Sequence, residues 1–287
     1  MSQAAEKTVL KVENLNVTFH QEGKSAHIVK DVSFSVNAGQ CLGILGESGS
    51  GKSMSCKAVL RLLDKNFEVD GEMTLLGENL REKSNEAVRK MRGSKITMVL
   101  QNPMNCFDPL YRIGDQMAET FAEHTNWDGK RIREESLAVL ELMRIRNPDE
   151  VLRKYPHQLS GGMLQRVMIG LAVKLEPDLI VCDEPTTAID SISRYAVMQE
   201  FLRIKKSTGA AMIFISHDLG VLSMIADQLV VMHRGRIVER GTVEDVFKNA
   251  TDAYTRELID RHTSVMNAFI NATQGRRLES KEARNAS

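Results

Sequence analysis

The chain has 287 residues, a length that suits one large α/β domain with an inserted or appended piece. Lysine and arginine total 38, as do aspartate and glutamate, so no net charge favours nucleic acid or an anionic membrane as a partner. The four cysteines lie far apart and include no CxxC pair, which argues against a zinc site, a redox motif and a disulfide framework. The N-terminus is polar, unlike a signal peptide, and no apolar stretch is long enough to span a bilayer. If the protein works at a membrane, we expect another subunit to cross it.

The N-terminal part of the chain is predicted to contain strands around a glycine-rich loop. Apolar and polar residues alternate over 9–19 and 32–36, as in half-buried antiparallel strands. A continuous apolar strand is expected over 41–45 and a helix over 52–63. The loop between them has the residues Gly46, Glu47, Ser48, Gly49, Ser50, Gly51, Lys52 and Ser53.

This loop has the full form of a phosphate-binding loop. Its glycines let the backbone curl so that successive N–H groups and the N-terminus of the following helix converge on an anion. Lys52 can then reach the β- and γ-phosphates, and Ser53 can ligate Mg²⁺. A turn that only joins a strand to a helix would not need a Lys-Ser pair there. We therefore predict that the chain binds a nucleoside triphosphate.

Helical segments are predicted to interrupt the strands in the middle of the chain. Strands are expected over 72–76 and 95–100, the second running directly into Gln101. No strand pattern appears from Gln101 to about residue 158. Together with the helix that follows, this stretch predicts a helical insert over about 102–178. Its expected helices are 115–124, 131–143 and 163–175.

Two short apolar runs later in the chain are each followed by candidate catalytic residues. Residues 179–182 and 211–215 predict strands buried on both faces of a parallel sheet. Asp183 and Glu184 directly follow the first run, where one carboxylate can hold Mg²⁺ and the other can accept a proton from, or orient, the attacking water. His217 follows the second run and is a candidate γ-phosphate sensor. Such acids can also merely cap a helix, and a lone histidine is usually structural, but the upstream phosphate loop favours the catalytic roles.

A second motif can bind an anion at the start of a helix. A serine and two glycines, Ser160, Gly161 and Gly162, precede the helix predicted from residue 163, where free N–H groups and the helix dipole attract an anion. The helical insert separates this motif from the phosphate loop, so we do not expect both to contact one nucleotide within one chain. A face-to-face or head-to-tail pair of chains would use both. Gln101, at a third strand end, is a further candidate for contacting Mg²⁺ or the attacking water, a weak prediction on spacing alone.

The C-terminal region is predicted to close the sheet and then to lose structure. Residues 228–239 have the pattern of a hairpin with its turn at 234–235. Beyond residue 246 apolar residues become sparse, so 249–287 is expected to be a tail, disordered over 275–287.

Taken together, the motifs resemble those of the nucleotide-binding subunit of ATP-binding cassette (ABC) transporters over about residues 9–248. The resemblance is carried, in order and spacing, by the phosphate loop, Gln101, Leu159, Ser160, Gly161, Gly162, Asp183, Glu184, Asp190 and His217. It implies an α/β fold with a P-loop (RecA-like) parallel-sheet core, an N-terminal antiparallel β subdomain and an inserted helical subdomain. It also implies an ATPase that binds ATP with Mg²⁺, two ATP molecules being sandwiched between two such domains.

The resemblance also implies roles for individual residues. Glu184 would be the general base, His217 would contact the γ-phosphate, and Asp190 would contact the partner domain. The Mg²⁺ ligands would be Ser53, Gln101 and Asp183. The residues that meet the partner's ATP would be Ser160, Gly161, Gly162 and Gln165. In this family an aromatic residue near the first strand stacks on adenine, and the candidate here is Phe19, with His27 as the alternative.

Members of this family work with other subunits. The implied partners are a second ATPase, identical or a paralogue, two transmembrane permease subunits and, indirectly, an extracytoplasmic solute-binding protein, with no nucleic acid. A permease helix would enter the groove around residues 101–109. The chain would then lie peripherally on the cytoplasmic face of the cell membrane.

Finer features resemble the importer ATPases for peptides and nickel. These features are the segments 102–110, 155–158, 183–187 and 253–258. Many peptide-importing members carry a cysteine-rich tail, whereas no cysteine follows Cys182, and Leu164 stands where they usually have a basic residue. Both departures favour the nickel or metallophore branch over the di- and oligopeptide branch. The seven histidines do not cluster, so this subunit would power metal import without binding the metal.

Two other classes of cassette ATPase remain as alternatives. A soluble ATPase of DNA repair or translation usually fuses two cassettes or inserts a long coiled coil, and this chain has neither feature. An accessory ATPase of a phosphonate-degrading complex is similar in sequence to peptide-importer ATPases. Copurification distinguishes the three classes, because permeases, ribosomes or DNA, and a soluble multi-enzyme complex would accompany them respectively.

Overall fold

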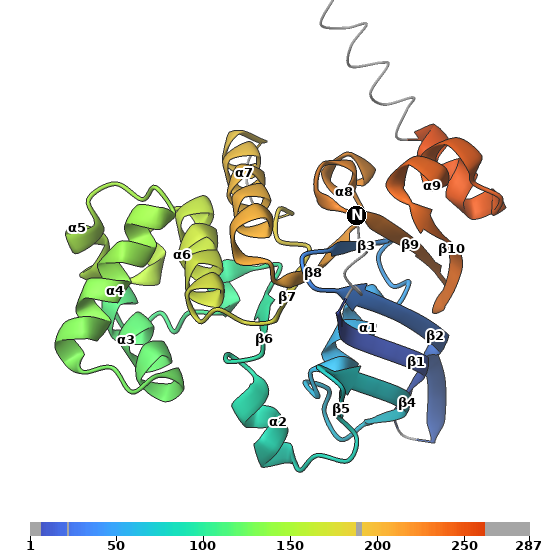
Figure 1. The fold of residues 1–287 in the computed structure, drawn as a ribbon, viewed down its shortest axis with the longest axis horizontal. Helices are drawn as coiled ribbons and strands as arrows, with labels where there is room; N and C mark the ends of the chain where they lie inside the picture. Colours follow the sequence, from blue (N-terminus) through green and yellow to red (C-terminus); the bar gives the residue numbers. More distant parts are fainter. Residues whose placement is uncertain (1–6, 22, 188–190, 262–287) are drawn as a thin grey trace, which may run out of the picture.

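The computed structural model describes residues 7–21, 23–187 and 191–261, and its strands form two sheets (Figure 1). The first is antiparallel, with four strands in the order β2-β1-β4-β5. Its strands are β1 (Thr8–Gln21), β2 (Lys24–Asn37), β4 (Phe67–Leu75) and β5 (Glu78–Asn79). Alternate apolar residues of β1 and β2 are buried, as their sequence pattern predicts. The β1–β2 hairpin is longer than predicted, because backbone pairing continues through its polar tip to Gln21 and Lys24.

The second sheet is predominantly parallel and holds six strands in the order β10-β9-β3-β8-β7-β6. Its strands are β3 (Cys41–Leu45), β6 (Ile96–Val99), β7 (Leu179–Asp183), β8 (Ala211–Ser216), β9 (Gln228–His233) and β10 (Arg236–Thr242). Only β10 runs antiparallel to its neighbour, as the predicted hairpin requires. Side chains of β7 alternate between two hydrophobic cores: Leu179 and Val181 join one, Ile180 and Cys182 the other. This burial on both faces explains the continuous apolar runs.

Helices between β6 and β7 form a separate region, at the left of Figure 1. They are α3 (Ile113–His124), α4 (Gly129–Leu142), α5 (Pro148–Leu152) and α6 (Gly161–Lys174), with single 3-10 turns at Pro103–Asn105 and Pro156–Gln158. On α3 the buried side chains Ile113, Met117 and Phe121 are spaced four residues apart, so one face of the helix enters the core shared with α4 and α6. The predicted fold class, a parallel α/β core with an antiparallel sheet and inserted helices, is confirmed.

The remaining helices belong to other parts of the chain. They are α1 (Lys52–Val59), α2 (Asn85–Met91), α7 (Ser191–Thr208), α8 (Leu219–Ile225) and α9 (Val243–Asn249). The predicted end of α1 at residue 63 is wrong, because the helix stops at Val59. Arg61 adopts a left-handed conformation with φ 49°, and the N–H groups of Arg61 and Leu62 donate back to the carbonyls of Ala58 (3.0 Å) and Lys57 (2.9 Å). This is a helix-ending motif that usually uses glycine, so the sequence alone does not indicate it.

The start of the expected tail is also more ordered than the sequence indicates. Residues 253–261 are helical, and Leu258 is buried in the same core as α6 and α8. Tyr254 and Leu258 are four residues apart, so one face of this short helix packs inward although apolar residues are sparse. The expected disorder over 275–287 and the dimer contact at Asp190 concern positions outside the described residues.

Candidate nucleotide-binding site

The phosphate loop connects β3 to α1 and is shaped by its glycines. Gly46, Gly49 and Gly51 have φ values of 155°, 82° and 102°, which other residues rarely adopt. At Gly46 the requirement is also steric, because a Cβ atom there would lie 2.3 Å from the carbonyl oxygen of Met232 on β9. The loop therefore curls tightly against the end of the neighbouring strand.

Lys52 is folded back onto this loop. Its side chain is 4% exposed, and its Nζ donates to the carbonyl oxygens of Gly46 (2.7 Å) and Glu47 (2.9 Å). Burial lowers the pKa of Lys52, and the carboxylates of Glu184 and Asp183 partly oppose that effect. A buried ammonium beside the curled backbone of this loop is suited to bind phosphate oxygens.

Asp183 ends β7 and faces the start of α1. The residue is 6% exposed, and its carboxylate accepts a 2.6 Å hydrogen bond from the Ser53 hydroxyl. Burial raises the pKa of Asp183, and the hydrogen bond from Ser53 lowers it again. A hydroxyl and a carboxylate in contact supply hard oxygen ligands, so this pair fits the donor set that Mg²⁺ prefers.

Glu184 is the centre of a cluster at three neighbouring strand ends. Its Oε2 atom accepts from Thr187 Oγ1 (2.9 Å) and Gln101 Nε2 (3.4 Å) and lies 3.2 Å from His217 Nδ1. Gln101 follows β6 and His217 follows β8, while Glu184 follows β7 between them. The backbone of Glu184 is left-handed, with φ 46°, and its N–H donates to Ile215 on β8 (3.0 Å). Such strain in a non-glycine residue is typical of a functional site.

The Glu184 cluster and the phosphate loop face one cavity of about 510 Å³. Among its lining residues are Lys52, Ser53, Gln101, Glu184 and His217, drawn from strand ends far apart in the sequence. Thr187 also lines the cavity, and sequence reasoning gave it no role although it belongs to the acidic motif. The structure thus brings most of the predicted catalytic and phosphate-binding side chains together.

The serine-glycine motif does not line this cavity. Ser160 caps α6, its hydroxyl accepting from the N–H of Met163 (3.3 Å), and its side chain is exposed. Gln165 contradicts its predicted position: its side chain is fully buried, so it does not reach a partner's nucleotide from here. Among the described residues, neither polar atom of its amide has a hydrogen-bond partner. The five-residue step from Ser160 to Gln165 turns the helix by about 140° beyond one full turn, so the serine faces outward and the glutamine inward.

The two candidates for stacking on adenine lie on the antiparallel sheet. Phe19, near the end of β1, packs on Phe67 with ring centroids 4.8 Å apart. His27, on β2, hydrogen bonds through Nε2 to Asn16 (3.0 Å). Neither side chain lines the cavity, whereas Ile28 does. An adenine role for either candidate therefore stays a proposal.

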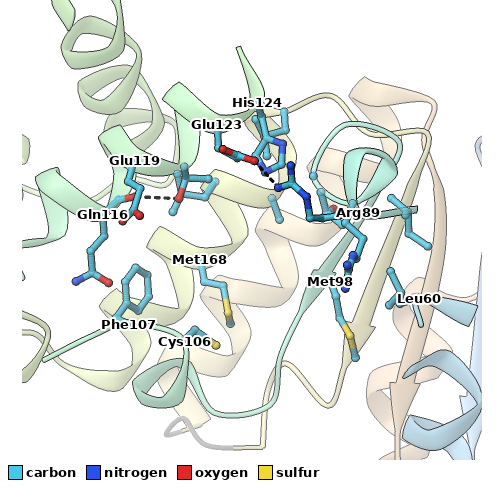
Figure 2. A pocket seen from close by; sticks show the side chains of 18 of the residues that line it. Leu60, Arg89, Met98, Cys106, Phe107, Gln116, Glu119, Glu123, His124 and Met168 are labelled. Carbon is cyan, nitrogen blue, oxygen red and sulfur yellow. Dashed lines mark hydrogen bonds and ion pairs between the residues drawn. The ribbon is translucent and has the colours of Figure 1, made fainter. Parts of the chain in front are cut away.

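A second cavity, of about 880 Å³, lies where the loop after Gln101 meets the helical region (Figure 2). Cys106 and Phe107 of that loop line it, and Met168 of α6 lies beside them in Figure 2. Glu123 of α3 forms an ion pair with Arg89 of α2 at 2.6 Å across the cavity wall. We call this cavity the insert groove. Its lining combines apolar and charged side chains, a mixture that suits an amphipathic helix.

Within residues 7–21, 23–187 and 191–261, no helix has both the length and the apolar character needed to cross a membrane. Over the same residues, no three histidine, cysteine or acidic side chains are grouped so that they could hold a metal ion.

Residues 29–187 match the ABC transporter family. The chain is 40% identical to the metal-staphylopine import system ATP-binding protein CntD of Staphylococcus aureus (strain NCTC 8325 / PS 47), over 93% of this chain and 98% of that protein. It is 39% identical to the oligopeptide transport ATP-binding protein OppD of Lactococcus lactis subsp. cremoris (strain SK11), over 90% of this chain and 77% of that protein.

Solved structures show the same fold. The cbiO1 protein of Clostridium perfringens, part of the ABC transporter complex cbiONQ, superposes with a TM-score of 0.71 and 25% identity over 85% of this chain and 92% of that one. An ATP-binding cassette solved as a dimer with ADP and Pi gives a TM-score of 0.73 over 82% of this chain and 98% of that one, and at 24% identity it supports the fold alone. With the phosphate loop and the Glu184 cluster on one cavity, these matches show that the chain belongs to the ABC transporter family, as an ATP-binding and ATP-hydrolysing subunit.

Proposed function

We propose that the cavity binds the triphosphate of ATP together with Mg²⁺. Lys52 and the loop N–H groups would hold the phosphate oxygens, and the ion would be held by Ser53, Asp183 and Gln101. The 2.6 Å contact between Ser53 and Asp183 supports this assignment, because both side chains already present oxygen atoms to one point. The bound ion would neutralise charge that develops on the phosphates.

Glu184 would act on the attacking water as general base. Thr187, Gln101 and His217 all contact one carboxylate oxygen, Oε2. The other oxygen makes none of these contacts, so it can accept the water's proton. His217 would contact the γ-phosphate from the tip of β8. One contact from each of three strand ends holds the Glu184 carboxylate in place. These contacts do not bury it completely, because the Glu184 side chain is 13% exposed.

The exposed Ser160 group would complete a second chain's site. Ser160 and Gly161 begin a 14-residue helix, whose N-terminus attracts anions, yet they face away from this chain's own cavity. A partner cassette, identical or a paralogue, would bring its ATP to this helix, with Asp190 at the contact. The arrangement makes hydrolysis depend on pairing.

Replacing Ser160 with arginine tests this pairing. We expect the variant to bind Mg²⁺-ADP within about 2-fold of wild type and to lose at least about 90% of its ATPase activity, because a bulky side chain would block closure on the partner's nucleotide. Ser84→Arg is the matched control, since Ser84 also caps an exposed helix start, α2. Loss of ADP binding in Ser160→Arg, measured by calorimetry, would place the serine in its own chain's site.

The insert groove would receive a helix of a membrane permease. The loop that lines it begins at Gln101, which contacts the catalytic Glu184, so movement in the groove is transmitted to the site through a few residues. Leu110 and Tyr111 of the same loop are 79% and 58% exposed, and Met104 is 44% exposed. An exposed apolar group on a loop that also lines a groove is typical of a protein interface. The chain would lie on the cytoplasmic face of the membrane.

Replacing Leu110 with glutamate should uncouple the subunit from its permease. We expect copurification with the neighbouring permease subunits to fall at least 5-fold while Mg²⁺-ADP affinity is unchanged, because a charge would have to be buried in the interface. The control is Leu142→Glu, at a leucine 54% exposed at the end of α4. Equal copurification of both variants would show that this exposed part of the loop is not on the docking surface.

The cargo that best fits this chain is a metal bound to a metallophore, with nickel complexes as the first candidates and di- or oligopeptides second. The observation that carries the choice is the 40% identity to the metal-staphylopine protein over 93% of this chain. Leu164, which stands where peptide-importing members usually have a basic residue, agrees with it. A solute-binding protein outside the membrane would deliver the cargo to the permease.

Reconstituted transport decides between these cargoes. The assay combines this ATPase with the neighbouring permease and binding protein and compares uptake of Ni²⁺, of a metallophore complex and of peptides. We expect ATP-dependent uptake of the chelated metal. Uptake of peptides alone would move the subunit to the peptide branch.

A further inference from the structure

The helix over residues 253–261 is firmly attached to the ATPase core. At its start, the Glu239 carboxylate of β10 accepts from the backbone N–H groups of Thr251 (2.7 Å) and Asp252 (2.8 Å), and these bonds lower the pKa of Glu239. Asp252 in turn caps the helix by accepting from the N–H of Tyr254 (3.0 Å). Further along, Leu258 is buried in the main core. The segment therefore holds its side chains in fixed positions.

Tyr254 on this helix reaches the phosphate loop. Its ring packs edge-on against His233 with centroids 3.8 Å apart, and its hydroxyl oxygen accepts a 3.0 Å hydrogen bond from the backbone N–H of Glu47. Burial raises the pKa of Tyr254, so the hydroxyl stays neutral at physiological pH. Arg261 adds an ion pair to the Glu47 carboxylate at 3.1 Å, but both side chains are more than half exposed, so this pair contributes little.

The contact matters because of the peptide unit to which it is made. The N–H of Glu47 and the carbonyl of Gly46 belong to one planar peptide group, whose atoms move together. Tyr254 holds the N–H end, and Lys52 Nζ donates to the carbonyl end at 2.7 Å. Rotation of this peptide would therefore displace the carbonyl on which the lysine rests.

We propose that Tyr254 is a positioning residue for ATP binding, which fixes the Gly46–Glu47 peptide and through it the ammonium group of Lys52. The proposal rests on the assignment of the phosphate loop as the nucleotide site. Residues 253–261 lie outside the family match over 29–187, so the proposal assigns a role in nucleotide binding to a segment beyond the matched region.

Replacing Tyr254 with phenylalanine removes the hydroxyl and keeps the ring on His233. We expect Mg²⁺-ADP affinity to fall about 2- to 10-fold, the range for loss of one hydrogen bond, and the melting temperature to fall by no more than about 6 °C, because the same bond contributes to folding. In ATPase assays KM for ATP should rise by a similar factor at constant kcat. Tyr195→Phe is the control, because Tyr195 lies 64% exposed on α7. Affinity equal to that of the control would overturn the proposal.

A double-mutant cycle separates positioning of Lys52 from a general structural role. In a Lys52→Ala background the Tyr254→Phe change should have no further effect on Mg²⁺-ADP affinity, measured with millimolar ligand, because the ammonium it positions is gone. An equal loss in both backgrounds would show that Tyr254 acts independently of the lysine, against the proposal. Normal affinity of Lys52→Ala by itself would instead refute the phosphate-loop assignment.

Discussion

Replacing Glu184 with glutamine is expected to lower kcat for ATP hydrolysis by about 10²- to 10⁴-fold, the usual contribution of a general base, while ATP affinity stays near wild type. The amide keeps the shape of the side chain, and its oxygen can take the Oε2 position that accepts from Thr187 and Gln101. What it loses is the ability to accept the water's proton. The cluster should remain assembled around an inactive group.

Single-turnover hydrolysis and equilibrium ATP binding check this prediction together. The control is Glu141→Gln, at an exposed position of α4, which removes the same charge away from the cavity. A folded Glu184→Gln protein with wild-type turnover would exclude Glu184 as the base. A variant that fails to bind ATP would show instead that the carboxylate holds the loop or the ion.

The parts of this site that the sequence predicts are those encoded by short segments. The phosphate loop, the acids at the end of β7 and the histidine after β8 each follow an apolar run that is visible in the sequence. Parallel strands place their carboxyl ends at one edge of the sheet, so these residues had to meet. The Ser53–Asp183 hydrogen bond and the contact between His217 and Glu184 show that they do.

The parts that the sequence does not predict depend on contacts between distant segments. Tyr254 and Glu47 are separated by 207 positions, and nothing near either residue indicates that they touch. Arg61, just after α1, has the left-handed backbone conformation that glycine usually adopts at a helix end. Its guanidinium donates to the carbonyls of Arg81 (3.0 Å) and Lys83 (2.8 Å), and these bonds hold the residue in place. Tertiary contacts override local preference in both places.

Gln165 was mispredicted for a different reason. Gln165 lies five residues after Ser160 in the same motif. An α-helix completes one turn every 3.6 residues, so residues of one motif can face different directions. Ser160 caps the exposed helix start, whereas Gln165 points into the interior. Motif membership therefore locates a residue on an element without determining which face it occupies.

Replacing Lys52 with alanine is expected to weaken ATP binding at least about 10- to 150-fold, the range for loss of one hydrogen bond to a charged group. No other side chain that lines the cavity within the described residues is a lysine or arginine, so the lost charge has no substitute. Lys65→Ala is the control, because Lys65 is exposed shortly after α1. Near-normal ATP affinity of Lys52→Ala by calorimetry would refute the phosphate-loop assignment.

The same variant reveals whether two chains share their sites. Mixing Lys52→Ala chains with Ser160→Arg chains gives mixed dimers in which one composite site carries both defects and the other carries neither. If identical chains pair and one intact site suffices, part of the ATPase activity should return, whereas each variant alone stays inactive. Ser84→Arg chains, which keep Ser160, serve as the reference partner. The other outcome is that each variant behaves as expected alone but activity does not return on mixing. In that case either the partner is a paralogous cassette or both sites must hydrolyse ATP. Repeating the mixture with the paralogue separates these two cases.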